Sequence, residues 1–410
     1  MKITIVGGGA AGFFAAIRAA EQNPGAVVQI LERGAEVLSK VRISGGGRCN
    51  LTHACFVPKE LVKFYPRGEK ELLGPFCTFN CADTVEWFEK RGVKTKTEQD
   101  GRIFPVSDQS RSVVDCLVQA AKDAGVKVLL QQRVSDITPP ASTGAPWRFS
   151  CNGSLHETDC LLIATGSSAA IWENLHNIGL EIIAPVPSLF TFNIRDERIQ
   201  ELPGLSVPRA EVSVEGSKLK SSGPLLITHW GMSGPAILKL SAWGARELHQ
   251  RQYRFSLRVN WCGENLQILR EAIEGQKITH PRLHPASQPM FHLPARLWRS
   301  LVMAASIPEE KRWADLNKKE LLALLEQLGN CRFHVTGKST FKEEFVTAGG
   351  LALKEINFKT FECKRFPGLF FAGEVLNIDA ITGGFNFQAA WTGGWIAGAA
   401  MAHLRPQDFI

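Results

Sequence analysis

The chain has 410 residues, more than one ordinary hydrophobic core accommodates, so we expect about two or three domains. Its 44% hydrophobic and 21% charged residues are typical of a globular protein and exclude a disordered or fibrous one. The formal charge of +7 favours an anionic or phosphate-bearing ligand. Because the basic residues form no long run, a dedicated nucleic-acid surface is not expected.

The ten cysteines do not form the pattern of a metal site or a disulfide framework. Cys77 and Cys81, the closest pair, are not spaced as Cys-x-x-Cys and have no second pair to complete a zinc site. No secretory signal is recognised, and the apolar residues 389–404 are too few and too rich in glycine to span a bilayer. We therefore predict a cytoplasmic protein with reduced thiols, no metal and no membrane segment.

The chain opens with the pattern of a β-α-β unit. An apolar run at residues 2–6 predicts a strand, residues 10–22 predict a helix, and residues 27–31 predict a second strand. The next segment, residues 34–57, is rich in glycine and too long to be only a connection. We interpret that segment as a functional loop.

A glycine pattern lies between the first strand and the helix. Gly7 permits a tight turn, Gly9 has no Cβ to block a pyrophosphate, and Gly12 allows close helix–strand packing. Glu32 ends the second strand at the spacing of a ribose-binding acid, and it would repel a ribose 2′-phosphate. The helix N-terminus attracts phosphate through its unpaired N–H groups. We expect a dinucleotide to contact Gly7, Gly9, Ala10, Ala11, Gly12, Glu32 and Arg33.

The remaining elements are predicted from periodicity in chain order. Helices are expected at 83–91 and 111–124, and strands at 126–130 and 160–164. Residues 188–260 have the pattern of short strands with one helix at 235–249, and residues 264–328 that of helices, including 293–304 and 318–328. A strand at 369–372 and a helix of small residues at 385–403 complete the chain.

Two later segments distinguish FAD from NAD, which the glycine pattern alone does not. Residues 161–166, Leu-Leu-Ile-Ala-Thr-Gly, resemble the strand and turn that two-dinucleotide-domain flavoproteins place near FAD. Residues 368–374, Gly-Leu-Phe-Phe-Ala-Gly-Glu, resemble their distal strand, whose acidic end meets the ribitol and pyrophosphate. The resemblance therefore implies FAD as the cofactor.

The loop at 40–52, with residues 347–350 and 383–388, resembles one bacterial family more closely. That family is the BaiN/YhiN-type flavoproteins, which are aminoacetone-oxidase-like and bile-acid-reductase-like FAD enzymes. The resemblance extends over nearly the whole chain and includes residues 223–235 and 293–297. It implies an α/β fold with a discontinuous Rossmann-type FAD-binding domain, an inserted β-rich domain and a small helical domain.

The resemblance also predicts the domain bounds and the cofactor contacts. The FAD-binding domain would comprise 1–187 and 345–410, the β-rich domain 188–262 with a return strand at 331–344, and the helical insertion 263–330. Arg48 would neutralise the pyrophosphate, and Asn386 and Gln388 would contact edge atoms of the flavin. Further implied cofactor contacts are Lys40, Gly47, Cys49, Asn50, Val134, Thr165, Gly166, Gly373, Glu374, Gly384, Phe385 and Phe387. Because Asn377 and Phe385 depart from the family pattern, no relative's substrate is carried over.

No residue pair has the pattern of an acid–base dyad, so the catalytic residues stay open. His229, Cys49 and Asn386 are the candidates. A redox role for the Cys49 thiol is less favoured than packing or contact with the cofactor, because no second cysteine lies two to five residues away to form a disulfide with it. His229 could face the flavin, but a lone histidine next to a tryptophan, here Trp230, more often has a structural role.

These patterns predict an FAD-dependent oxidoreductase that transfers a hydride between flavin N5 and a small organic substrate or NAD(P)H. No second glycine pattern is present, so NADH or NADPH would bind only transiently. A reductase is favoured over an amine-type oxidase that uses oxygen. An RNA-modifying or RNA-binding flavoprotein is the alternative of another class, and a non-catalytic flavin sensor is a third. The substrate and the oligomeric state stay open.

Overall fold

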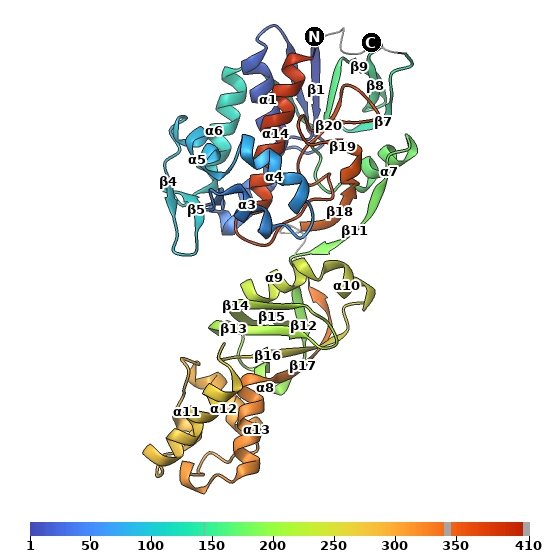
Figure 1. The fold of residues 1–410 in the computed structure, drawn as a ribbon. Helices are drawn as coiled ribbons and strands as arrows, with labels where there is room; N and C mark the ends of the chain where they lie inside the picture. The colour runs from blue at the N-terminus through green and yellow to red at the C-terminus, as the bar shows by residue number, and fades with distance from the viewer. Residues whose placement is uncertain (143, 340–345, 405–410) are drawn as a thin grey trace. The chain divides into compact units, whose positions relative to one another are not determined.

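The computed structural model describes residues 1–142, 144–339 and 346–404, which form two compact units (Figure 1). The terminal unit contains the described residues of 1–186 and 346–404, so both ends of the chain contribute to it. The barrel unit contains residues 187–339. The predicted boundary between residues 344 and 345 lies outside the described residues, as do residues 405–410.

A seven-stranded sheet forms the centre of the terminal unit. Its strand order is β19 (Ile356–Asn357), β20 (Glu362–Cys363), β21 (Leu369–Phe371), β10 (Cys160–Ile163), β1 (Lys2–Val6), β2 (Val27–Leu31) and β6 (Lys127–Leu129). The strands from β21 to β6 are parallel to one another, β20 pairs antiparallel with β21, and β19 pairs antiparallel with β20. The central strands β1 and β10 are almost continuously apolar and buried, as expected of parallel strands covered on both faces. The predicted α/β fold class is therefore confirmed.

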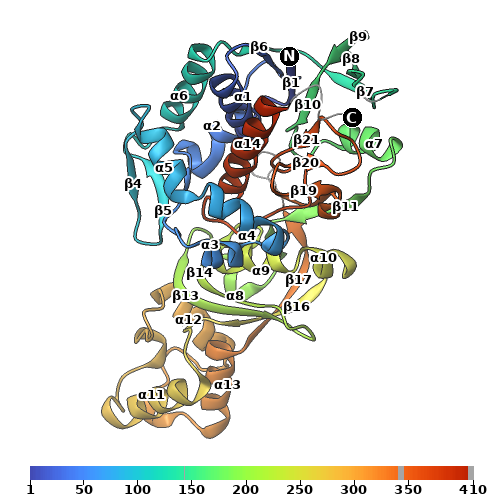
Figure 2. The same ribbon diagram turned by 45° about the horizontal axis from the view of Figure 1, so that its top comes forward.

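Two helices from opposite ends of the chain cover this sheet. In both ribbon views, α1 (Ala10–Gln22) and α14 (Phe385–His403) lie side by side (Figures 1 and 2). Glycine permits this approach, since a Cβ at Gly394 would lie 2.4 Å from the Ala11 carbonyl oxygen. A Cβ at Gly398 would lie 2.5 Å from the Ala15 carbonyl oxygen. The small residues of α14 therefore bring the two termini of the chain together.

Shorter elements surround these helices and the sheet. The segment 34–57, predicted as a loop, contains a short helix α2 (Ser39–Ile43), a 3-10 turn (Ser44–Gly47) and strand β3 (Thr52–His53). Strand β3 pairs with β5 (Arg102–Pro105), which pairs with β4 (Thr95–Thr97). The other elements are α3 (Pro58–Leu61), α4 (Glu69–Thr78), α5 (Cys81–Glu89), α6 (Ser110–Asp123), β7 (Val134–Thr138), β8 (Trp147–Cys151), β9 (Ser154–Thr158), α7 (Ala169–Asn177), β11 (Ile182–Ser188) and β18 (Val346–Leu351).

The barrel unit is built around a closed six-stranded barrel. Its strands, in spatial order, are β12 (Thr191–Ile194), β15 (Gly231–Ser233), β14 (Lys220–Thr228), β13 (Ser206–Val214), β16 (Phe255–Asn260) and β17 (Cys331–Ser339). The helix predicted at 235–249 is two helices, α9 (Pro235–Trp243) and α10 (Ala245–Gln250), because the backbone leaves the helical conformation at Gly244. Helices α8 (Glu197–Gln200), α11 (Leu266–Thr279), α12 (Ala295–Ala304) and α13 (Lys318–Gly329) complete the unit.

The helices and the barrel share one hydrophobic core. Trp298 of α12 and Leu324 of α13 belong to the same buried cluster as Leu257 and Phe333 of the barrel. The segment predicted as a helical insertion is thus packed continuously with the barrel. Among the described helices, none has the length and apolar character that crossing a bilayer requires.

Candidate functional site

Two glycines of the N-terminal pattern are required by the fold itself. Gly7 donates its N–H to the Leu31 carbonyl (2.9 Å) and has a φ of 112°, a conformation that favours glycine. A Cβ at Gly7 would lie 2.4 Å from the Ala164 carbonyl oxygen, and one at Gly12 would lie 2.0 Å from the Gly7 carbonyl oxygen. Any side chain at these two positions would collide with the backbone of the sheet or the turn.

Gly9 is different, because nothing in the protein requires a glycine there. Its φ of −93° is open to any residue, and an added Cβ would meet no heavy atom within 4 Å. Gly9 is the N-cap of α1, and the helix has neither a side-chain cap nor an acidic residue in its first turn. Open space therefore lies beside the unpaired N–H groups at the positive end of α1, where Ala10 and Ala11 follow.

Glu32 lies at the end of β2 and holds the glycine turn in place. Its Oε2 accepts a hydrogen bond from Gly8 N (2.8 Å), and its Oε1 accepts one from Gly34 N (2.7 Å). The Gly8 carbonyl in turn accepts from Leu38 N (2.8 Å). Each carboxylate oxygen retains a second lone pair, so Glu32 can accept a further hydrogen bond from a ligand hydroxyl.

Four separate segments meet beside the turn that follows β10. Glu374, just beyond β21, is ion-paired with Lys40, and its Oε1 accepts from Thr347 N of β18 (3.0 Å). Gly166 has a φ of 63°, and a Cβ there would lie 3.7 Å from Glu374 Oε2. The Thr165 hydroxyl oxygen is buried and has no protein hydrogen-bond partner. A buried hydroxyl without a partner is costly, and this one is left available to a ligand; its contact with a cofactor stays a prediction.

The loop after α2 combines left-handed backbone conformations with a buried thiol. Gly45, Gly46, Gly47 and Cys49 all have positive φ values, between 58° and 83°. Cys49 is fully buried, and burial raises the pKa of its thiol to about 12. The thiol is therefore neutral at physiological pH, and the geometry gives no support to a thiolate that interacts with the flavin.

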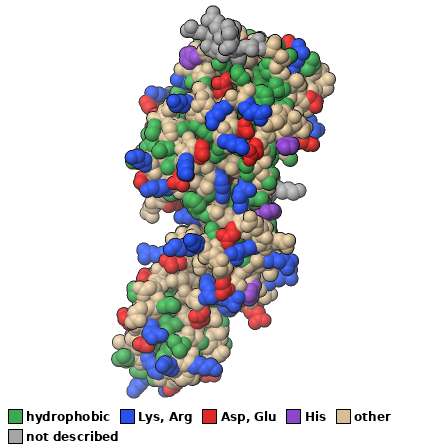
Figure 3. All heavy atoms as spheres, turned by 45° about the vertical axis from the view of Figure 1, so that its right-hand side comes forward, with side chains coloured by type: hydrophobic (Ala, Val, Ile, Leu, Met, Phe, Trp, Pro, Cys, Tyr) green, Lys and Arg blue, Asp and Glu red, His purple; other side chains and the backbone are tan. Residues whose placement is uncertain are grey.

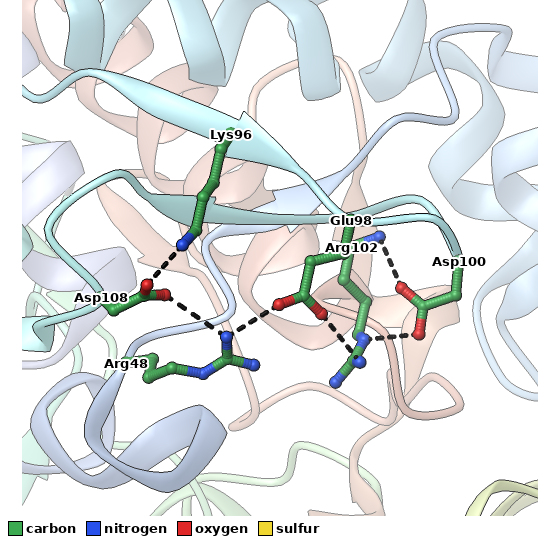
Figure 4. A network of polar contacts seen from close by, with 6 residues as sticks. All are labelled: Arg48, Lys96, Glu98, Asp100, Arg102 and Asp108. Atoms are coloured by element: carbon green, nitrogen blue, oxygen red, sulfur yellow. Dashed lines mark hydrogen bonds and ion pairs between the residues drawn. The ribbon is translucent and has the colours of Figure 1, made fainter.

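Arg48 is held by carboxylates of the hairpin β4–β5 and the residues that follow it. Its Nη1 donates to Glu98 Oε1 (2.7 Å) and to Asp108 Oδ1 (3.3 Å), and the guanidinium lies 4.0 Å from the centre of the Phe104 ring. Lys96 and, to a smaller extent, Arg48 hold the pKa of Asp108 below its usual range. The contact of Arg48 with a pyrophosphate stays a prediction. Figure 4 shows the whole network, Arg48, Lys96, Glu98, Asp100, Arg102 and Asp108.

The N-terminus of α14 is fastened to the same loop. A Cβ at Gly384 would lie 2.6 Å from the Thr52 carbonyl oxygen, and φ at Gly384 is 88°. With its amide oriented to satisfy both atoms, Asn50 accepts from Gly384 N (2.9 Å) and donates to the Thr52 carbonyl (3.1 Å). Asn386 folds back, accepting from Ala380 N (2.9 Å) and donating to the Ala380 carbonyl (3.2 Å). The Asn386 amide therefore holds the segment that precedes α14 against the first turn of the helix.

Gln388 lies in a buried polar network. Its Oε1 accepts from the hydroxyls of Thr52 (2.6 Å) and Thr84 (2.9 Å), and its Nε2 donates to Thr392 Oγ1 (3.1 Å). The side chain is fully buried, with protein partners on both amide atoms. The expectation that Gln388 contacts the flavin edge is therefore wrong, because its hydrogen-bonding capacity is used to join α14 to β3 and α5.

Phe385, the first residue of α14, is the centre of an aromatic stack. Its ring lies 4.3 Å from Phe64 and 4.6 Å from His53, both in stacked geometry. Tyr65 donates its hydroxyl to the Phe385 carbonyl (2.6 Å). Burial lowers the pKa of His53, so this ring stays neutral near pH 7. Sequence reasoning missed His53, Phe64 and Tyr65, because no local pattern indicates which distant rings will meet.

A buried ion pair was also missed by sequence reasoning. Arg67 makes a bidentate contact with Asp379, whose side chain is fully buried. The two residues also pair as an isolated β-bridge, which joins the segment before α4 to the segment before α14. This contact fixes the chain between Glu374 and Gly384, two of the predicted cofactor residues.

The other predicted contacts are distributed through the terminal unit. Gly373 has a φ of 78°, and a Cβ there would lie 3.2 Å from the Cβ of Ala11. Arg33 is exposed after β2, and Val134 is buried at the start of β7. Phe387 stacks on Trp391 within α14. Their contact with a cofactor stays a prediction.

His229, a catalytic candidate, belongs to the barrel unit rather than the terminal unit. It lies in the exposed turn between β14 and β15, next to Trp230, whose side chain is 60% exposed. Within the described residues, no group of three His, Cys, Asp or Glu side chains is placed to hold a metal ion.

Several relatives share most of the length of this chain. It is 28% identical over 403 residues to a ribosomal RNA dihydrouridine synthase from Escherichia coli (strain K12), covering 95% of each chain. It is 26% identical over 416 residues to a 3-dehydro-bile acid delta(4,6)-reductase from Clostridium scindens, covering 98% of this chain and 99% of the relative.

Solved structures and a family model give the same picture of the fold. A 3-ketosteroid-delta4-(5alpha)-dehydrogenase from Rhodococcus jostii RHA1 superposes with a TM-score of 0.53 at 16% identity, covering 98% of this chain and 96% of that one. A 3-ketosteroid delta1-dehydrogenase from Sterolibacterium denitrificans gives 0.52 at 11% identity, covering 98% and 99%. The model of the HI0933-like protein Rossmann domain matches residues 1–400. The chain therefore belongs to the HI0933-like Rossmann family, the BaiN/YhiN-type flavoprotein family that its motifs resemble.

Proposed function

We propose that this protein is an FAD-dependent oxidoreductase whose cofactor is held by the terminal unit. The observation that carries the proposal is the open space at Gly9, beside the uncapped N-terminus of α1. A glycine that no protein atom requires, at the positive end of a helix, fits a pyrophosphate that approaches the backbone closely.

The neighbouring residues fit the rest of an FAD molecule. Glu32 has acceptor capacity left for ribose hydroxyls, and it disfavours a 2′-phosphate. Thr165 has a buried hydroxyl without a protein partner, and Glu374 lies near the same turn. The fit requires both ends of the chain, because Glu374 follows β21 while Glu32 follows β2.

When bound, FAD supplies a hydride donor and acceptor at N5, and the chain supplies binding and orientation. The N-terminus of α14 has no side-chain cap and no acidic residue in its first turn. It therefore presents unpaired N–H groups and a positive potential, which stabilise a nearby anion by about 1 kcal/mol or less. Asn50 and Tyr65 fix that helix end through Gly384 and Phe385.

The names of two relatives support one class of substrate. Dihydrouridine is uridine with one ring double bond reduced, and a delta(4,6)-reductase acts on double bonds conjugated with the 3-oxo group of its substrate. We therefore infer reduction of a carbon–carbon double bond conjugated with a carbonyl. Overall, NAD(P)H would give a hydride to the β-carbon and water a proton to the α-carbon, leaving NAD(P)⁺, hydroxide and the saturated product.

Anaerobic stopped-flow mixing of the FAD-loaded protein with NADH and NADPH separately tests the reductase proposal. Bleaching by one nucleotide, followed by recovery of colour with an enone or a uridine-containing RNA, supports it. An oxidase would instead recover colour rapidly with oxygen and respond to neither nucleotide. A protein whose flavin no donor reduces would contradict any catalytic role.

A further inference from the structure

The net positive charge of the chain belongs to one unit. Residues 187–341 contain 21 Lys and Arg against 14 Asp and Glu, a net charge of +7. The rest of the chain contains 26 of each kind and has no net charge. The formal net charge of +7 is therefore the net charge of the barrel unit. On the side drawn in Figure 3, basic side chains are spread over the surface of this unit.

Folding aligns several of these residues in a row across the barrel. Lys220 of β14 pairs in register with Ser213 of β13, Ser213 with Arg258 of β16, and Arg258 with Arg332 of β17. Directly paired residues of antiparallel strands point to the same face. Their neighbours along the strands, such as Leu257, are buried in the barrel, so the row lies on the outer face. With strands about 4.8 Å apart, the row extends roughly 14 Å.

The next row on this outer face adds hydroxyl and imidazole groups. Glu215 N bonds to the Ser256 carbonyl (3.0 Å), and Ser256 pairs in register with His334. Arg332 donates to Ser256 Oγ (3.1 Å for Nη2). Glu215 is shared by Arg258 (2.8 Å) and Arg332 (3.0 Å), so two guanidinium groups converge on one anionic group.

Lys220 of the first row and two further cations at its edge have no acidic partner in the described part of the chain. Lys218 is in the turn between β13 and β14, Lys220 begins β14, and Arg254 immediately precedes β16. All three are exposed. Glu211 and Glu215 are the acidic residues on the outward positions of β13 and its extension, so positive charge is in excess on this face.

We propose that this outer barrel face, formed by Lys218, Lys220, Arg254, Arg258 and Arg332, binds the phosphate backbone of RNA. Arginine guanidinium groups and hydroxyl groups are the usual hydrogen-bond partners of phosphate oxygens. A row of roughly 14 Å matches several consecutive phosphates rather than one. The choice of RNA over another polyanion rests on the proposed function, because two relatives are named as enzymes of ribosomal RNA. The inference revises the expectation that nucleic acid is not a partner.

The test measures binding of a fluorescein-labelled, uridine-containing RNA hairpin to the full-length protein by fluorescence anisotropy. One variant carries Lys220→Gln, Arg258→Gln and Arg332→Gln. A second carries Lys218→Gln, Lys220→Gln and Arg254→Gln, which removes no observed ion pair. The control, Lys59→Gln, Lys70→Gln and Lys127→Gln, removes the same charge from exposed positions of the terminal unit.

We expect both outer-face variants to bind RNA at least about tenfold more weakly than the unmodified protein. The slope of log K against the logarithm of the salt concentration should become less steep by about two to three. The control should bind like the unmodified protein, and all variants should keep their FAD content and melting temperature. Equal binding by the three variants, no binding by the unmodified protein, or a preference for phosphatidylserine vesicles over RNA would overturn the inference. If NAD(P)H reduces the bound flavin normally but the protein binds no RNA, the inference fails and the proposed function stands. If the protein binds RNA but takes up no FAD, only the proposed function fails.

Discussion

The two units differ in the positions of their polar and charged side chains. In the terminal unit, polar groups are turned inward, including the Gln388 network, the Arg67–Asp379 pair and the unpartnered Thr165 hydroxyl. In the barrel unit, one apolar core fills the interior, and the whole net charge of the chain belongs to this unit. The comparison agrees with the two proposals made above, in which the terminal unit binds FAD and the barrel unit binds an anionic partner.

The largest expected effect is at Gly9. Replacing Gly9 by Val should abolish FAD uptake while leaving the apoprotein folded, because a Cβ at this position meets no heavy atom within 4 Å. Titration with FAD and circular dichroism of the apoprotein check the two parts. RNA binding should be unchanged if the two units act separately.

Gly74→Val is the matched control for this substitution. Gly74 lies in α4, and a Cβ there also meets no heavy atom within 4 Å. This variant should bind FAD normally. If Gly9→Val retained one equivalent of FAD, the open space would not be the pyrophosphate site.

The next effect in size concerns the stability of the terminal unit. Arg67→Met leaves the fully buried Asp379 carboxylate without its arginine, which should cost about 3–5 kcal/mol of unfolding free energy. Hydrogen–deuterium exchange, followed separately in each unit, should show faster exchange near α4 and α14 and no change in the barrel.

Adding Asp379→Asn to the Arg67→Met variant should recover part of this loss, because no charge then remains buried. Equal destabilisation of both units by Arg67→Met would contradict the separation drawn above.

Glu32→Ala should weaken FAD binding by about 1.5–3 kcal/mol, the contribution of a hydrogen bond to a charged group. Because Glu32 also accepts from Gly8 and Gly34, the apoprotein should melt at a lower temperature as well. Glu36→Ala, which removes an exposed carboxylate from the same loop, serves as the control. Unchanged FAD affinity in Glu32→Ala would show that the ribose does not bind there.

The smallest effect is expected at Cys49. Cys49→Ser should leave the rate of flavin reduction within about twofold, because a thiol with a pKa of about 12 carries no charge near pH 7. No long-wavelength charge-transfer band should appear in the unmodified protein below pH 10. Such a band, lost in Cys49→Ser, would show that the thiolate contacts the flavin.

Local patterns predicted the parts of this molecule that depend on neighbouring residues. The glycine turn, Glu32 and the helix at 385–403 follow from periodicity and spacing, and the structure places them as expected. The family resemblance predicted that both chain ends form one unit, which is seen in the pairing of β10 with β21.

Contacts between distant segments could not be predicted in this way. Arg67 and Asp379, or Phe385 and His53, are separated by hundreds of residues, and nothing near them indicates the partner. The row from Lys220 to Arg332 could not be predicted either, because strand register rather than sequence order brings these charges together. Gln388 was assigned to the flavin because two of its three threonine partners, Thr52 and Thr84, lie in elements far from it in sequence.

The central claim is that the two ends of the chain together bind one FAD at the Gly9 space. Calorimetric titration of the cofactor-free protein with FAD, with Gly9→Val measured alongside, tests it most directly. We expect one equivalent of FAD to bind the unmodified protein and none to bind the variant. Failure of the unmodified protein to take up FAD, or equal uptake by both proteins, would contradict the claim.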